Sequence, residues 1–196
     1  MATGSTRLSK PARREQLLDT AMAIVRAHGT DSLTPLTLAE AAGVSRPIVY
    51  DHFGTRSGLL IALYRRLDER HRAASEEALR DAPADPREIA RVLSTAYFAC
   101  ATDMPEWTAV SAALKGSQEM EEIERELLDG YTDLMVTALR PYSGLTREAL
   151  RLRCVGVLGA AEAIAAELNR GRATVAAAIA ALTDLTVDGI DTGAQD

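Results

Sequence analysis

The segment Thr34–Leu60 places an unusual set of side chains on the outside of a short helix. Basic, aromatic and apolar residues share this outer side, a combination that is rare on a surface that meets only water: Arg46, Pro47, Ile48, Tyr50 and His52. A short helix, a tight turn with a glycine and a second short helix form the helix-turn-helix arrangement, whose second helix enters the major groove of DNA. The chemistry predicted for this set is therefore contact with a nucleic acid.

Caps and breakers predict the elements that position this set. Thr34-Pro35 starts a short helix over 36–42, and Ser45 offers a cap for a second helix over 46–53. Gly43 between them suits the left-handed turn conformation that a residue with a Cβ resists. Three apolar positions are expected to pin the second helix to its neighbours: Val44, Val49 and Phe53.

These residues resemble the DNA-binding domain of the tetracycline-repressor (TetR) family of bacterial regulators. The resemblance covers about residues 10–65 and is carried by Leu38-Ala39, Ala42-Gly43-Val44-Ser45, Val49-Tyr50, His52-Phe53, Thr55-Arg56 and Leu59-Leu60. It implies a homodimeric, ligand-responsive transcription factor, usually a repressor, which binds a palindromic operator in double-stranded DNA.

The resemblance also implies individual DNA contacts. Arg46 would reach a base edge or a phosphate, Pro47 and Ile48 would contact groups such as a thymine methyl, and Tyr50 and His52 would bind phosphate oxygens. Helix-capping hydroxyls would add phosphate contacts, and an N-terminal basic arm would contact flanking phosphate or the minor groove. The alternative for these N-terminal basic residues is a solvated tail without DNA contacts. The complete expected set is Lys10, Arg13, Arg14, Thr34, Ser45, Arg46, Pro47, Ile48, Tyr50, His52 and Arg56, the last standing where the family usually has lysine.

The charge distribution agrees with a DNA-binding N-terminal part. The chain has 196 residues, with 22 Lys+Arg against 28 Asp+Glu and a net charge of −6. Residues 1–56 carry seven basic and five acidic side chains, a net charge of +2, which leaves −8 for the remainder. A polyanion is therefore expected to meet the N-terminal part.

The composition predicts an all-α fold of about nine helices. Aromatic residues are only 4% of the chain, and no alternating Val/Ile/Thr run is bounded by hairpin turns. Helices are expected from Ser9 to His28, over 36–42, 46–53, 55–82, 86–103, 105–115, 118–140, 146–169 and 173–188. We expect a DNA-binding domain over 1–55, a helical ligand-binding and dimerisation domain over 56–190 and a disordered tail over 191–196.

The last two predicted helices have almost no polar stripe. Helices that are apolar all round need cover on every side, and a twofold pairing with a second copy would supply it, although the core of a monomer would do so as well. Small residues such as Gly156 would permit close approach. The expected interface is Val155, Gly156, Leu158, Gly159, Ala163, Val175, Ile179 and Leu182.

Aromatic and sulfur-bearing residues concentrate in the middle helices. By the family resemblance these residues would line a cavity for a small, largely apolar effector, whereas plain core packing is the alternative. The candidates are Tyr97, Phe98, Cys100, Met104, Trp107, Tyr131 and Met135. Neither a cofactor nor a metal is expected.

The other function classes find little support. The histidines His28, His52 and His71 are scattered and form no metal-ligand motif, and no nucleophile elbow exists at Gly54–Gly58, where the serine is one place late. An enzyme is therefore not expected, and the main alternative is a helical small-molecule-binding protein whose N-terminal part no longer binds DNA. The longest uncharged runs have eleven residues, too few to span a membrane, and a cytoplasmic protein is expected.

Overall fold

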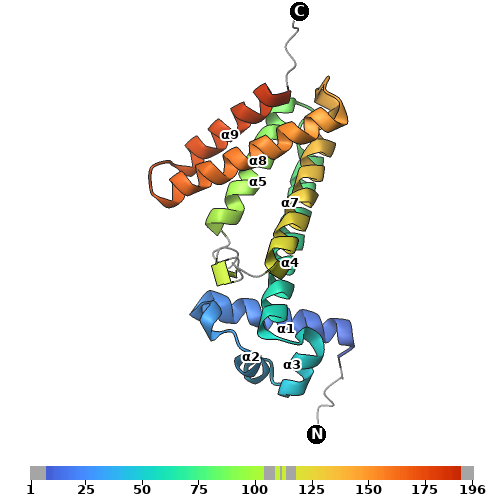
Figure 1. The fold of residues 1–196 in the computed structure, drawn as a ribbon, viewed down its shortest axis with the longest axis vertical. Coiled ribbons are helices and arrows are strands. Elements are labelled where there is room, and N and C mark those ends of the chain that lie inside the picture. The colour runs from blue at the N-terminus through green and yellow to red at the C-terminus, as the bar shows by residue number, and fades with distance from the viewer. Residues whose placement is uncertain (1–7, 104–108, 111, 114–117, 191–196) are drawn as a thin grey trace, which may run out of the picture. The chain divides into compact units, whose positions relative to one another are not determined.

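The computed structural model of the chain is built from helices, and the residues it describes (8–103, 109–110, 112–113 and 118–190) contain no strand (Figure 1). The helices are α1 (Lys10–His28), α2 (Pro35–Ala42), α3 (Arg46–Phe53), α4 (Arg56–Asp81), α5 (Pro86–Asp103), α7 (Gln118–Leu139), α8 (Arg147–Asn169) and α9 (Val175–Ile190), with the short 3-10 helices η1 (Thr30–Ser32) and η2 (Arg140–Tyr142). This confirms the predicted all-α fold. The helix expected over 105–115 lies largely outside the described residues, and the tail expected over 191–196 lies entirely outside them.

The chain forms two compact units, which divide inside α4. Unit 1 comprises residues 1–67 and 105–120, and unit 2 comprises residues 68–104 and 121–196. Helix α4 continues without a break from Arg56, one residue after the expected boundary at residue 55, and its first turns bury Leu59, Leu60 and Leu63 in unit 1. The expected domain boundary stays a prediction.

The caps predicted from the sequence set the helix ends in unit 1. The Ser9 hydroxyl accepts a hydrogen bond from the Ala12 N–H, and Thr34 and Thr37 form a reciprocal capping box at the start of α2. Gly43 ends α2 with φ +65°, in the left-handed region. The apolar faces of α1, α2 and α3 bury Leu17, Leu18, Ala21, Met22, Val25, Leu38, Ala39, Val49 and Phe53.

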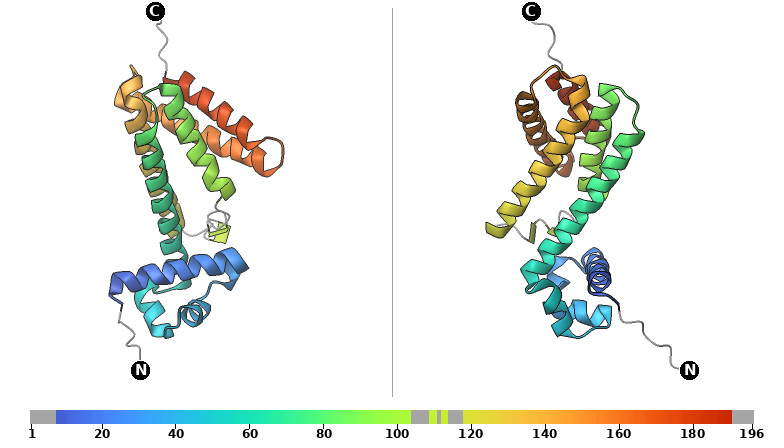
Figure 2. Two further views of the ribbon diagram at one scale, coloured as in Figure 1. Left: turned by 180° about the vertical axis from the view of Figure 1, so that it is seen from behind. Right: turned by 90° about the vertical axis from the view of Figure 1, so that its right-hand side faces the viewer.

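Unit 2 has α5, α8 and α9 packed around an apolar core. The antiparallel helices α8 and α9 lie side by side in every view, and α5 packs against both (Figures 1 and 2). The core includes Ile89, Leu93, Met135, Leu139, Leu150 and Cys154. Burial raises the pKa of the Cys154 thiol to about 11, so this side chain behaves as a small apolar group. No described helix combines the length and apolarity needed to cross a bilayer.

Replacing Gly43 tests the turn that joins α2 to α3. A Cβ at this position meets nothing within 4 Å, so the left-handed backbone is the only obstacle to a side chain. We expect Gly43→Ala to lower the free energy of unfolding by about 1 kcal/mol in urea denaturation. Gly43→Asn is the control, because asparagine tolerates this conformation better. Equal stability of the alanine variant and the unmodified protein would contradict this account of the turn.

Candidate nucleic-acid interface and interior cavities

Helix α3 separates anchoring side chains from outward ones as predicted. Val49 and Phe53 are buried, whereas Arg46, Pro47, Ile48 and Tyr50 are exposed. Ile48 and Tyr50 expose 37% and 52% of their surface, an unusual amount for large apolar and aromatic side chains. The α3 surface therefore presents one cation, one phenol and two apolar groups on a helix that its opposite side fixes in place.

The N-terminus of α3 has free hydrogen-bonding capacity. Ser45 adopts the extended conformation of an N-cap residue, but its hydroxyl makes no capping hydrogen bond and its side chain is exposed. The expectation that Ser45 caps α3 through its hydroxyl is therefore wrong. Pro47 has no N–H and the Ile48 N–H donates to the Ser45 carbonyl oxygen at 3.0 Å, so the Ser45 hydroxyl and the Arg46 N–H are the groups at this helix start that can still bind an anion. The Thr34 hydroxyl, in contrast, is occupied by the capping box of α2.

The basic residues expected to form an arm lie in the first turns of α1, and two of them contact α3. The Arg14 guanidinium donates to the His52 carbonyl oxygen at 3.0 Å and lies 4.9 Å from the centre of the Phe53 ring. Lys10 Nζ lies 2.9 Å from Asp51 Oδ2. Arg13 instead donates to Gln16 Oε1 within α1. Lys10 and Arg14 therefore brace α3, and the DNA contacts of all three residues stay predictions.

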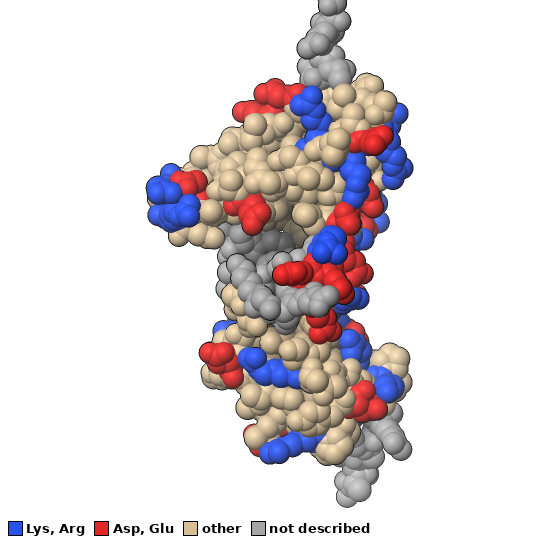
Figure 3. Space-filling model, viewed as in Figure 1, with Lys and Arg blue, Asp and Glu red and all other residues tan. Residues whose placement is uncertain are grey.

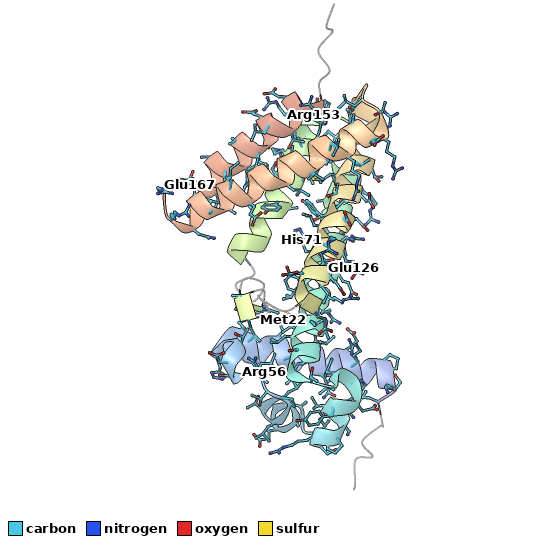
Figure 4. All side chains as sticks on the ribbon, viewed as in Figure 1. Met22, Arg56, His71, Glu126, Arg153 and Glu167 are labelled. Carbon is cyan, nitrogen blue, oxygen red and sulfur yellow. The ribbon has the colours of Figure 1, made fainter. Side chains whose placement is uncertain are left out.

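Arg56 also has a structural role in place of a free guanidinium. Its Nε donates to the Leu33 carbonyl oxygen at 2.9 Å and its Nη2 donates to the Thr30 carbonyl oxygen at 2.7 Å, which ties the start of α4 to η1 (Figure 4). Both carbonyls follow the end of α1, and that of Thr30 also accepts from the Leu33 N–H at 3.0 Å. Two of the donor nitrogens of Arg56 are therefore used within unit 1, and its contact with DNA stays a prediction.

The charge states of α3 favour its N-terminal half for anion binding. Lys10 holds the pKa of Asp51 below its usual range and offsets its charge. Desolvation lowers the pKa of His52, with Lys10 adding to the effect, so the imidazole is neutral near pH 7. Arg46 has no hydrogen-bond or ion-pair partner among the described residues, and it is therefore the cation of α3 that is free to meet a phosphate or a base.

Some of the residues expected to bind the effector are buried in the core of unit 2, and others line a small cavity there. Phe98 and Met135 are fully buried core residues, whereas Tyr97 and Tyr131 are half-buried, with ring centres 6.4 Å apart. Tyr97, Tyr131 and Met135 line a small cavity of about 10 Å³ between α5, α7, α8 and α9. The side chain of Cys100, and Met104 and Trp107 as a whole, lie outside the described residues.

Two further hollows lie on the surface of unit 2. A groove of about 240 Å³ between α4 and α5 is lined mainly by small residues, with His71 at one side: Ala74, Ser75, Ala78, Val92, Ala96 and Ala99 belong to it. A wider groove of about 530 Å³ between α4 and α7 carries both charges, including Arg72, Glu76, Arg80 and Asp133. Acidic and basic side chains also alternate along this unit on the face drawn in Figure 3, so charge selects no single class of ion there.

The outer face of α8 and α9 is apolar and exposed. Leu152 exposes 70% of its surface, and Val155, Val175 and Leu185 are exposed as well. Gly156, Gly159 and Ala163 share this exposed stripe of α8. Leu158 and Leu182, which we expected at the same interface, are buried in the core of their own chain, and Ile179 is partly buried against that core. The exposure of Leu152 and Leu185 was not predicted, because apolar runs do not show which side of a helix faces inward.

No metal site is evident in the part of the chain that the structure describes, where no three His, Cys, Asp or Glu side chains gather to hold an ion.

Two arginine-to-alanine variants compare the contribution to stability of a hydrogen-bonded arginine, Arg56, with that of an exposed one, Arg46. We expect Arg56→Ala to lower the free energy of unfolding by about 1–2 kcal/mol, because the Thr30 and Leu33 carbonyls lose a charged donor. Arg46→Ala is expected to change it by less than about 0.5 kcal/mol, because the side chain is exposed and makes no hydrogen bond or ion pair with the described residues. Thermal unfolding of the two full-length variants measures the difference. Equal stabilities would show that the Arg56 contacts contribute nothing to unit 1.

Residues 17–63 match the family model described as bacterial regulatory proteins, tetR family. The HTH-type transcriptional regulator BetI of Rhizobium meliloti is 33% identical over 119 residues, which are 61% of this chain and 58% of that protein. The chain thus matches less than two thirds of the length of this curated relative. Unit 1, with α3 at its surface, carries the match to the family model.

Solved structures share the fold over nearly the whole chain. A protein from Rhodococcus sp. RHA1 aligns with a TM-score of 0.74 at 24% identity, covering 96% of this chain and 99% of that one. The regulator FadR from Bacillus subtilis, solved in complex with stearoyl-CoA, aligns with a TM-score of 0.67 at 19% identity, covering 90% and 99%. The family-model match across residues 17–63 and the curated relatives thus support the resemblance of this chain to the TetR family of bacterial regulatory proteins.

Proposed function

We propose that this protein is a repressor that binds a palindromic operator as a homodimer and releases it when a small, largely apolar effector binds. The observation that carries the proposal is α3, which exposes Arg46, Ile48 and Tyr50 while Val49 and Phe53 fix it from behind. A helix of this kind reads the major groove in helix-turn-helix proteins. The relative BetI is itself described as a transcriptional regulator. The operator DNA and its regulator would meet in the bacterial cytoplasm.

The free groups of α3 divide between positioning and base recognition. The Ser45 hydroxyl and the Arg46 N–H suit a phosphate, and Tyr50 suits a second one. Arg46 suits guanine O6 and N7 or a phosphate, and Ile48 suits a thymine methyl. Lys10 stands at the edge of this surface, where it balances Asp51 and reduces repulsion between that carboxylate and the DNA.

The proposed dimer forms through the exposed apolar stripe of α8 and α9. Leu152, Val155, Val175 and Leu185 would be covered by the same residues of a second copy, since a twofold interface joins identical patches. Gly156 and Gly159 leave nothing above their helix surface and would permit close approach of the two α8 helices. A dimer carries two copies of α3 and therefore favours an operator with two inverted half-sites.

The proposed effector binds in unit 2 and acts through a population shift. A ligand changes DNA affinity only if it binds the competent and incompetent conformations with different affinity. Helix α4 runs from unit 1 into unit 2 and lines both surface grooves, so it is the element whose position an effector would bias. FadR, of similar fold, was solved with stearoyl-CoA, which agrees with an effector that has a large apolar part.

Alanine variants of α3 test the proposed DNA contacts. We expect Arg46→Ala and Tyr50→Ala each to weaken binding to a labelled duplex from the region upstream of the protein's own gene by about fivefold to 100-fold. Fluorescence anisotropy over a range of salt concentrations is the measurement. If Arg46 binds a phosphate, its removal also lowers the salt slope by about one.

Arg80→Ala is the matched control, since Arg80 is an exposed arginine of unit 2. Its binding is expected to equal that of the unmodified protein. Normal operator binding by both α3 variants would show that these α3 side chains do not contact DNA. The absence of any specific complex with the unmodified protein would refute the proposal.

A charge in the exposed stripe tests the dimer. Leu152→Glu places a carboxylate in the proposed interface and is expected to shift the protein from a dimer to a monomer in size-exclusion chromatography with light scattering. Leu128→Glu is the control, because Leu128 of α7 is exposed to 49% but lies off the stripe. A dimer that survives in the Leu152 variant would place the interface elsewhere.

A further inference from the structure

Ser94 is the exception among the buried hydroxyls of unit 2. Ser75, Thr132, Thr183 and Thr186 each donate to the carbonyl oxygen four residues earlier in their own helix, at 2.7–2.9 Å. Ser94 is 1% exposed, and among the described residues its Oγ is the buried side-chain oxygen or nitrogen without a hydrogen-bond partner. An unpaired hydroxyl in such a place destabilises the fold, so its presence calls for a partner from outside the chain.

The hydroxyl faces the small cavity that also adjoins Tyr97 and Tyr131. This cavity of about 10 Å³ has room for one small polar group, and apolar side chains form the rest of its wall: Leu93, Met135, Val157, Leu158 and Leu182. Two other hydroxyls of its wall are already bonded, that of Thr186 to the Leu182 carbonyl oxygen and that of Tyr131 to the Leu93 carbonyl oxygen. The buried Ser94 hydroxyl, in contrast, can receive or donate a new hydrogen bond.

Tyr131 links the cavity to the groove between α4 and α5 through one ring contact. Its ring lines the cavity and stacks against His71, which lines the groove, with ring centres 6.0 Å apart (His71 is labelled in Figure 4). The Tyr131 hydroxyl donates to the Leu93 carbonyl oxygen at 3.0 Å. Turning the Tyr131 side chain would break that hydrogen bond and open space beside His71.

The groove itself suits an uncharged, slender molecule. Its walls are mostly alanine and valine side chains, and the arginine at its edge, Arg91, is bound to Glu88 by two hydrogen bonds of 2.7 and 2.9 Å. Burial lowers the pKa of His71, so its imidazole carries no charge near neutral pH. A charged group that entered here would lose its hydration without meeting an opposite charge.

We propose that Ser94 Oγ is the polar anchor of the effector site, and that the effector is a neutral molecule with an apolar body in the α4/α5 groove and one hydrogen-bonding group at Ser94. This inference rests on the proposed ligand-responsive function and names the ligand class for it. The single hydroxyl fixes the orientation of the molecule, while the alanine-lined groove selects for a narrow shape.

Three probes of equal chain length test the ligand class: 1-octanol, octanoate and octylammonium. We expect isothermal titration calorimetry of the full chain at neutral pH to show binding of 1-octanol and at least tenfold weaker binding of both ions. Ser94→Ala is expected to weaken 1-octanol binding by about threefold to tenfold, the contribution of one neutral hydrogen bond. Thr183→Val, whose hydroxyl lines neither space, is expected to leave the affinity unchanged.

Thermal stability supplies a readout that does not need the ligand. Ser94→Ala removes an unpaired hydroxyl, whereas Ser75→Ala removes one that is bonded to the His71 carbonyl oxygen in an equally buried place. We expect the Ser94 variant to have the higher Tm of the two and to melt no lower than the unmodified protein. A Ser94 variant that melts lower than the Ser75 variant would show that its hydroxyl is already satisfied, and would overturn the proposal.

The binding results overturn the proposal in two ways. No detectable 1-octanol binding up to its solubility would refute the ligand class, and unchanged affinity in the Ser94 variant would refute the anchor. Failure of the proposed DNA-binding function is separate, because calorimetry and melting involve no DNA. If the chain binds 1-octanol through Ser94 but binds no operator, the ligand site is supported and the proposed role as a DNA-binding regulator is refuted.

Discussion

The anchoring of α3 by its inner face is the constraint on which the proposed function depends. Val49 and Phe53 are buried, each contributing about 1.5–3 kcal/mol, and the Arg14 guanidinium covers the Phe53 ring while it binds the His52 carbonyl oxygen. A rotation of α3 about its axis would expose these groups. Arg46, Ile48 and Tyr50 are therefore held outward by the packing behind them, before any DNA is present, which reduces the entropy lost on binding.

This constraint changes the role of the basic residues of unit 1. Lys10, Arg14 and Arg56 look alike in the sequence as cations beside a helix-turn-helix, yet each has an internal partner: Asp51, the His52 carbonyl and the carbonyls of Thr30 and Leu33. Their charge still contributes to the field around the unit. Several of their donors hold α3 and the start of α4, whereas Arg46 has no hydrogen-bond or ion-pair partner among the described residues, so we propose Arg46 for direct contact.

The sequence predicted what depends on neighbours along the chain. Ser9, Thr34 and Gly43 act within four residues of themselves, and the helix limits that they predict agree closely with the structure. The partners of Arg56 lie 23 and 26 residues away, so its bracing role left no local signal. The burial of Leu158 and Leu182 and the exposure of Leu152 also left no local signal, because they depend on how the helices pack. The unpaired hydroxyl of Ser94 depends on helix packing in the same way. The division of the chain inside α4 was hidden because no residue breaks that helix.

Selection of bound sequences from a pool of random DNA duplexes tests the central claim most directly, because it asks the full chain to choose its own site. Two copies of a fixed α3 predict that the enriched sequences contain two inverted half-sites, and that Arg46→Ala loses enrichment at specific positions within both. Enrichment of no sequence, or of a motif that Arg46→Ala and Tyr50→Ala select equally well, would contradict the account.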